Sequence, residues 1–332
     1  MFLIKNRLLY VTLMIWLVIA LAAYGGQAGS GASNAPAEQT GDSSPVTDKS
    51  TKIFKAANGD VEIPVHPQRI VAITFLGDLL ALGVKPVGAG SIALNNSVLL
   101  EKELEGVADV GDVSVEKVLE LNPDLIIVPT YLPSETVEQL KKIAPTVAIP
   151  SVGLEGGDPL EELKTFGVML GKEKEAEAFI ARYKQKAEEA KAKLNGIIGP
   201  DETVGSYSIW AKNLWVWPKT RDAGYNLFEM LQYKPQDKIA KEIFPDGKGK
   251  DISLEVLPEF AADHMFITVY EPDGGAERAK EVANGAIWQG LPAVKNNHVY
   301  YLDYKKFWMI DGLNLEKQLD ILVDLIVKQN QK

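Results

Sequence analysis

Aromatic side chains and one arginine are the main groups in this sequence that could recognise a ligand. Trp210, Trp215 and Trp217 fall within eight residues, and Arg221 follows them. Trp308 stands in "KKFWMIDG", just before the last helical segment. Indole rings pack on apolar and cationic groups, and a guanidinium donates hydrogen bonds to paired oxygens. The predicted ligand contacts are Trp215, Trp217, Arg221 and Trp308. Core packing is the alternative for Trp210 and Trp215.

The residues of common catalytic and metal sites are missing or poorly spaced. The chain has no cysteine, no G-x-S-x-G and no H-E-x-x-H, which argues against a thiol nucleophile, a hydrolase elbow and a zinc-protease helix. The three histidines, His66, His264 and His298, lack metal-site spacing and are expected to be separate surface or strand-end residues. The sequence predicts no catalytic residue and no metal ligand, so binding is favoured over catalysis.

Alternating strand and helix patterns predict an α/β fold. The apolar segments "RIVAIT" (69–74), "LIIVP" (125–129) and "TVAIP" (146–150) are predicted strands, and helical segments separate them. This order predicts a parallel sheet buried on both faces. Residues that follow the carboxyl ends of such strands face a crevice, so Phe75 and Tyr131 are also predicted ligand contacts.

One long helix is predicted to separate two lobes. Residues 172–195 contain no glycine or proline and are rich in Ala, Glu and Lys, which predicts a helix of roughly 36 Å. The segment "SVEKVLELNPDLIIV" (114–128) aligns with "SLEVLPEFAADHMFI" (253–267) on the other side of it, each read as a capped helix before a buried strand. We therefore predict two Rossmann-like lobes, 53–168 and 198–332, joined by a rigid helical segment over 169–197.

The N-terminal residues predict export. Lys5 and Arg7 precede a mostly apolar run that is short for a membrane span, so residues 1–24 are interpreted as a signal peptide. Residues 25–52 are rich in Gly, Ser, Ala, Pro and Thr and are interpreted as a flexible tether. The formal charge of −10 would become −12 without the first 24 residues. Such an acidic protein is not expected to bind nucleic acid or anionic lipid.

Several segments together resemble a known transport family. "PQRIVAITFLGDLLALGVKPVGAG", "VEKVLELNPDLIIV" and "IWQGLPAVKNNHVYYLD" are similar to the ferric-siderophore/vitamin B12-binding proteins of bacterial ABC importers. The resemblance covers roughly residues 53–330 and implies a class III substrate-binding fold, with one helix bridging two lobes. It implies a monomer, not an enzyme, that captures a ferric siderophore and delivers it to a permease. The siderophore would supply every iron ligand, so no cofactor is expected. Haem, cobalamin, a free divalent metal or an exported enzyme activity are the alternatives.

The resemblance also implies roles for individual residues. Trp308, Trp217 and Arg221 match positions where hydroxamate-siderophore relatives contact their ligand. A triscatecholate carries a charge of about −3 and should need several basic residues, whereas these segments offer aromatics and one arginine. A hydroxamate siderophore is therefore favoured. Glu116 and Glu255 match the acidic residue that docks each lobe of the relatives onto arginine pockets of the permease.

Tyr24 departs from the pattern of the family. Its lipoprotein signal reads Leu-x-x-Cys, whereas "LAAYGG" places Tyr24 where the lipidated cysteine is expected. Tyrosine has no thiol to alkylate, so lipid attachment at this position is excluded. The protein is expected at the outer face of the cell membrane or in the periplasm, either held by its leader or released by cleavage near Tyr24.

Overall fold

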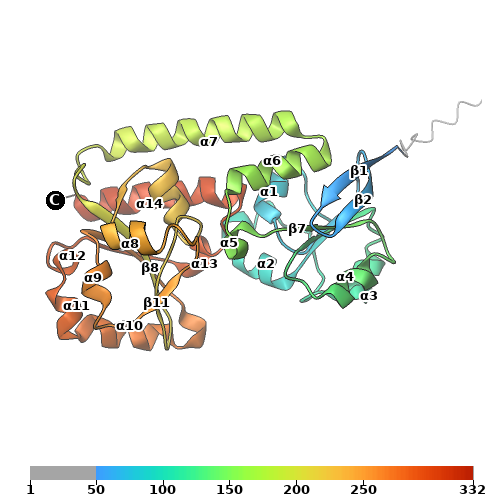
Figure 1. Cartoon of the computed structure of the whole chain (residues 1–332). Coiled ribbons are helices and arrows are strands. Elements are labelled where there is room, and N and C mark those ends of the chain that lie inside the picture. Colours follow the sequence, from blue (N-terminus) through green and yellow to red (C-terminus); the bar gives the residue numbers. More distant parts are fainter. Residues whose placement is uncertain (1–49, 332) are drawn as a thin grey trace, which may run out of the picture. The chain divides into compact units, whose positions relative to one another are not determined.

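The structure is a computed structural model that describes residues 50–331 (Figure 1). The predicted signal peptide, Tyr24 and most of the predicted tether lie outside the described residues. A hairpin of β1 (Thr51–Ala56) and β2 (Gly59–Pro64) opens the described part, so residues 51 and 52 belong to a strand and not to the tether. No helix among the described residues is long and apolar enough to span a bilayer.

The first lobe is built on a five-stranded parallel sheet with strand order β5-β4-β3-β6-β7. Its strands are β3 (Ile70–Ala72), β4 (Gly88–Ala89), β5 (Ala108–Asp109), β6 (Leu125–Pro129) and β7 (Thr146–Ile149). Its helical segments are α1 (Leu76–Ala81), α2 (Ser91–Asn96), η1 (Val98–Leu100), α3 (Val115–Glu120), α4 (Ser134–Leu140), α5 (Val152–Glu155) and α6 (Pro159–Leu170). Every residue of β6 is buried, as its unbroken apolar sequence predicts for a central parallel strand.

The second lobe contains a six-stranded mixed sheet in which β8, β12 and β13 run parallel. Its strands are β8 (Thr203–Ile209), β9 (Leu214–Val216), β10 (Lys234–Pro235), β11 (Lys250–Ile252), β12 (His264–Val269) and β13 (Val299–Leu302). Its helical segments are η2 (Tyr225–Met230), α8 (Asp237–Glu242), α9 (Leu257–Phe260), η3 (Glu271–Asp273), α10 (Gly275–Asn284), α11 (Ala286–Gly290), α12 (Pro292–Lys295), α13 (Tyr304–Phe307) and α14 (Gly312–Asn330). β9 and β11 add an antiparallel edge to the parallel strands.

The internal repeat is less regular than its sequence predicts. The first copy contains the expected helix α3, and the Ser114 hydroxyl accepts a hydrogen bond from the Lys117 amide at 3.3 Å as its cap. In the second copy only Leu257–Phe260 is helical. Pro258 lies at the start of this short helix, because proline has no amide hydrogen and fits only the first turn.

The predicted long helix is α7, which spans Glu173–Leu194. Figure 1 shows it running beside α6 and α14. Phe179, Tyr183 and Ala187, which share one stripe of the helix, are all buried. Three ion pairs join its outer edge to α14: Arg182–Glu316, Lys186–Asp320 and Lys193–Asp324. Because α14 closes the second lobe, these contacts fix the helix against that lobe from its middle to its C-terminal end.

A buried hydrogen bond holds α7 to the second lobe. The Tyr183 hydroxyl donates to Asn226 Oδ1 at 2.7 Å, and Asn226 Nδ2 donates to the Leu315 carbonyl at 3.0 Å. We expect Tyr183→Phe to lower the free energy of unfolding by about 1–3 kcal/mol, because it leaves a buried amide oxygen without a partner. Urea unfolding tests this. Tyr301→Phe, at a half-exposed ring, is the control, and an equal loss in both variants would contradict the prediction.

Candidate ligand-binding cleft

A cleft of about 300 Å³ lies between the two lobes. The first lobe contributes Thr74, Phe75, Ile92, Ala93, Tyr131, Ser151, Gly153, Leu154 and Glu162 to its lining. The second lobe contributes Arg221, Trp308, Met309, Ile310 and Asp311. A hollow of about 470 Å³ beside α6 and α7 is larger, but half of its lining is charged and it contains no tryptophan. The inter-lobe cleft therefore has the apolar surface and few polar groups of a small-molecule site.

An aromatic recess of about 10 Å³, large enough for a water-sized group only, adjoins this cleft. Its lining comprises Ser208, Trp210, Trp217, Arg221, Asp222, Thr268, Tyr270, Tyr304 and Trp308. Trp210 directly follows β8, and Tyr270 directly follows β12. The carboxyl ends of the parallel strands therefore form this wall, as the strand-end rule predicts. Arg221 and Trp308 border both hollows and join them into one surface.

Arg221 lies between two indole rings. Its guanidinium carbon is 5.3 Å from the ring centre of Trp217 and 5.1 Å from that of Trp308. Its Nη1 donates across the cleft to the Gly153 carbonyl of α5 at 3.1 Å. Its Nε is buried without a hydrogen-bond partner in the protein. The side chain is thus held in place by cation–π contacts and one hydrogen bond, and it keeps donor capacity for a ligand.

Trp217 is anchored by a buried polar group, and Trp215 lies behind it. Trp217 Nε1 donates to the Ser208 hydroxyl at 2.5 Å, and Ser208 in turn donates to Asp222 at 2.6 Å. Trp215 stacks on Trp217 with ring centres 5.1 Å apart, but it lines neither hollow. Trp308 stacks on Tyr270 at 5.5 Å. Of the three predicted tryptophans, the structure places Trp308 in the cleft lining and Trp217, which is 9% exposed, in the recess only. Trp215 packs behind Trp217.

The two residues predicted from strand ends both reach the cleft lining. Tyr131 is 54% exposed and presents its ring to the opening. Phe75 is only 3% exposed, and its ring lies 5.1 Å from that of Phe166 in the core of the first lobe. Its left-handed backbone, with φ of 68°, begins α1 directly after the turn that follows β3.

A family profile covers most of the chain. The profile described as periplasmic binding protein matches residues 71–305, which is well over half of the sequence. The chain belongs to the periplasmic binding protein family. This finding confirms the family resemblance drawn from the sequence.

Proteins of Bacillus subtilis (strain 168) that align with nearly the whole chain support this family assignment. The iron(3+)-hydroxamate-binding protein YxeB is 37% identical over 331 residues, covering 99% of each chain. The iron(3+)-hydroxamate-binding protein FhuD is 36% identical over 320 residues, covering 94% of this chain and 95% of FhuD. A crystal structure of an FhuD fold-family component of a ferrichrome ABC transporter from Bacillus subtilis has a TM-score of 0.71 at 34% identity, covering 83% of this chain and all of that one. The predicted class III fold is thereby confirmed.

Three buried carboxyl groups, here called the junction carboxyls, lie where the lobes meet: Asp78, Glu162 and Asp311. The Gly77 amide donates to Asp311, and the Gly312 amide donates to Asp78, both at 2.9 Å. Burial raises the pKa of Asp78 well above its ordinary value, that of Glu162 to about 8, and that of Asp311. Glu162 and Asp311 line the cleft, so near neutral pH the floor of the cleft carries less negative charge than its residues suggest.

Several residues that line the cleft and the recess were not predicted from the sequence. Tyr270 and Tyr304 follow β12 and β13, so the strand-end rule applied to the second lobe would have found them. Glu162 and Asp311 could not be found in this way, since an isolated carboxyl on a helix is usually solvated. The predicted docking residues Glu116 and Glu255 are exposed and lie away from the cleft lining.

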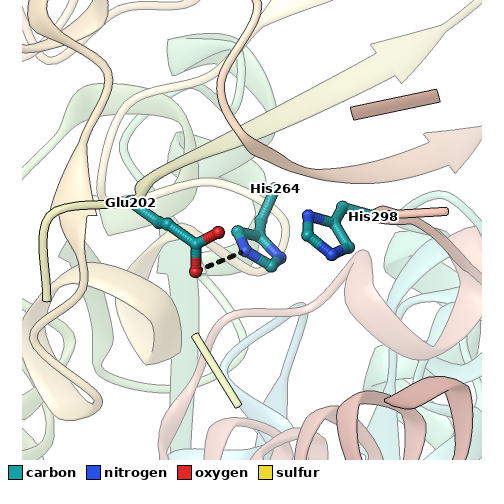
Figure 2. A group of neighbouring side chains, drawn as sticks. All are labelled: Glu202, His264 and His298. Carbon is teal, nitrogen blue, oxygen red and sulfur yellow. Dashed lines mark ion pairs between the residues drawn. The ribbon is translucent and has the colours of Figure 1, made fainter. Parts of the chain in front are cut away.

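The expectation for the histidines is wrong for two of them. His264 and His298 are not separate: their rings stack with centres 4.1 Å apart, and Glu202 lies beside them (Figure 2). Sequence spacing missed the group because neighbouring parallel strands bring together residues far apart in the chain. Burial lowers the pKa of His264, so its imidazole is neutral at neutral pH. His66 is exposed and belongs to no such group.

Proposed function

We propose that this protein captures a ferric siderophore, of the hydroxamate type, and delivers it to the permease of an ABC importer for iron uptake. The observation that carries the proposal is the guanidinium of Arg221, held between Trp217 and Trp308 at the boundary of the cleft and the recess. Two aromatic side chains of the cleft lining, Tyr131 and Trp308, suit the apolar backbone of the chelate. The guanidinium suits the hydroxamate oxygens. The names of the two iron(3+)-hydroxamate-binding relatives support the same ligand class.

The charge of the cleft favours a neutral or cationic chelate. Among the described residues, Arg221 is the one basic residue in the cleft lining, and a pKa raised to about 8 reduces the negative charge of Glu162. A triscatecholate with a charge of about −3 would lose its hydration here without enough positive partners. The lining of the cleft includes no histidine, which fits a protein that leaves iron coordination to the siderophore. We propose that the protein acts by binding alone, as a monomer and without a cofactor.

Intrinsic fluorescence tests the ligand class. A ferric trishydroxamate such as ferrioxamine B is expected to quench tryptophan emission at sub-micromolar concentration, because Trp308 lines the cleft and Trp217 lies in the adjoining recess. Titrations with a ferric triscatecholate, haem, cobalamin and Zn²⁺ serve as comparisons and are expected to give much weaker saturable quenching. Tight binding of haem or cobalamin instead would show that the protein is a receptor of the same family for a different ligand. No response to any ferric chelate would contradict the proposal.

The proposed permease contacts are Glu116 and Glu255. Glu116 is exposed in the first turn of α3, and Glu255 is exposed in the turn before α9. A hydrogen bond with Ser253 lowers the pKa of Glu255, so this carboxylate is charged at neutral pH. Exposed carboxylates on both lobes could pair with two basic pockets of a permease.

We expect the double variant Glu116→Ala/Glu255→Ala to bind the siderophore normally and to reduce cellular iron uptake roughly tenfold. The matched control is Glu120→Ala/Glu277→Ala, which removes two exposed carboxylates from α3 and α10. Uptake of radioactive iron by cells that lack the native receptor provides the measurement. Normal uptake with the first variant, or an equal loss with the control, would contradict a docking role for Glu116 and Glu255.

We propose an exported location, at the outer face of the cell membrane or in the periplasm. Relatives named as ABC transporter substrate-binding and siderophore-binding lipoproteins support this placement. Tyr24 stands where lipidation needs a cysteine, so the protein is proposed to be held by its leader or released by cleavage rather than anchored by a lipid at this position. Intact-mass analysis of membrane and secreted fractions distinguishes a leader-held chain from a cleaved one.

A further inference from the structure

Glu202, His264 and His298 form a compact group of side chains (Figure 2). Glu202 directly precedes β8, His264 is the first residue of β12, and His298 directly precedes β13. These three strands are neighbours and run parallel. The group therefore lies at their amino ends, whereas the aromatic recess lies at their carboxyl ends. We propose that it is a binding site for a divalent transition metal, Zn²⁺ in the first place.

One pair of donor atoms has the separation that a small metal ion needs, and the third donor lies close by. Each residue offers one donor, and the three donors lie within 4.8 Å of one another. Nε2 of His264 lies 3.3 Å from Oε2 of Glu202. Tetrahedral zinc with bonds of 2.0–2.1 Å holds its ligand atoms about 3.3 Å apart. This pair of atoms is thus already at the spacing of two ligands on one ion.

The two histidine donors are poorly satisfied within the protein, whereas Glu202 Oε2 already accepts a hydrogen bond from the Gly199 amide at 2.6 Å. Nε2 of His264 is buried and, despite its distance to Glu202, is not aligned for a hydrogen bond. Nδ1 of His298 is also buried without a hydrogen-bond partner. His264 is 0% exposed, so an unpaired ring nitrogen there has a substantial desolvation cost. A metal ion would satisfy both nitrogens at once.

A supporting shell orients the central ligand. Nδ1 of His264 lies 3.2 Å from the Tyr300 hydroxyl, which accepts a hydrogen bond from Asn330 Nδ2 at 3.0 Å. This contact directs the other ring nitrogen toward Glu202, as outer partners do for metal-bound histidines. Asp263, which accepts hydrogen bonds from Thr203, adds a second acidic group beside the site. The surroundings are therefore negative and favour a divalent cation.

Metal binding requires one movement. The rings of His264 and His298 are nearly parallel, with an angle of 10° between them, so one ion cannot lie in both ring planes. His298 is partly exposed and belongs to the turn before β13, which leaves it free to rotate out of the stack. Glu202 is 39% exposed and provides the route of entry. A bound ion would pin the segment after α7 to the two strands and leave one position for water.

Calorimetric titration of the full chain with Zn²⁺, after treatment with a chelator, tests the site. We expect one ion per chain, and Glu202→Gln and His298→Ala should each raise the Kd at least about tenfold. His66→Ala is the matched control, because it removes the remaining histidine of the chain without touching the group. X-ray absorption at the zinc edge should show two imidazole ligands in the parent. Absence of saturable binding, or equal weakening by His66→Ala, would overturn the proposal.

Two further measurements separate this site from folding defects and from siderophore binding. Without added metal, His298→Ala should unfold at nearly the same temperature as the parent, and Zn²⁺ should raise the midpoint of the parent only. Both site variants should bind a ferric trishydroxamate as the parent does, because the cleft is at the other end of the strands. Loss of siderophore binding together with zinc binding would show a general structural defect and contradict a separate metal site.

Discussion

Replacing Arg221 by alanine is expected to weaken the binding of a ferric trishydroxamate roughly 10- to 100-fold. The guanidinium is oriented by two indole rings and by the Gly153 carbonyl, and its Nε has no partner in the protein. Hydrogen bonds to charged groups contribute about 1.5–3 kcal/mol each, which corresponds to this range of affinities. The Kd from fluorescence titration measures the effect.

A lysine at the same position separates charge from geometry. Arg221→Lys keeps the positive charge but loses the planar donor group that stacks on the indoles. It is expected to recover only part of the lost affinity. Arg278→Ala serves as the control, since Arg278 is exposed and pairs with Glu281 within α10. Unchanged affinity in Arg221→Ala would show that the chelate binds elsewhere, and a full rescue by lysine would show that charge alone matters.

The elements that local sequence determines were predicted well. The long helix follows from a 24-residue stretch of strong helix formers, and its observed span of Glu173–Leu194 differs from 172–195 by one residue at each end. The wider joining segment predicted over 169–197 is wrong at both ends, because residues 169 and 170 end α6 and α7 stops before Asn195. The strand β6 coincides with the apolar run Leu125–Pro129. Both depend on propensity and hydrophobic pattern within a single segment. Short strands such as β4, with two residues, depend on their neighbours in the sheet and carry little signal of their own.

The cleft was predicted in part, because residue type and strand order give only its outline. Trp215 and Trp217 are two residues apart and were both predicted as contacts, with core packing as the alternative for Trp215. Packing in the folded lobe decides that Trp217 borders the recess. The junction carboxyls were not predicted at all. Gly77 and Asp311, which join the lobes there, are 234 positions apart. This hydrogen bond forms only when both lobes have folded, so no local sequence pattern predicts it.

The junction carboxyls give the protein a pH dependence to which Glu162 contributes. Burial raises the pKa of Glu162 from 4.5 to about 8, so the folded protein holds a proton that the unfolded chain has released between these pH values. Its stabilising contribution is fully present below about pH 4.5 and is lost as the pH rises toward 8. At about 1.4 kcal/mol per pKa unit, the total is a few kcal/mol.

The variant Glu162→Gln is expected to reduce the loss of stability between pH 5 and pH 8, because an amide does not titrate. Its carbonyl oxygen can still accept the hydrogen bond that the Val152 amide donates to Glu162 at 3.1 Å. The free energy of unfolding in urea, measured at several pH values, provides the comparison. Glu161→Gln makes the same change at the neighbouring exposed residue of α6 and should keep the pH dependence of the parent. If both variants and the parent lose stability equally with pH, the proton is not held at Glu162. The reduced negative charge argued for the floor of the cleft would then be wrong as well.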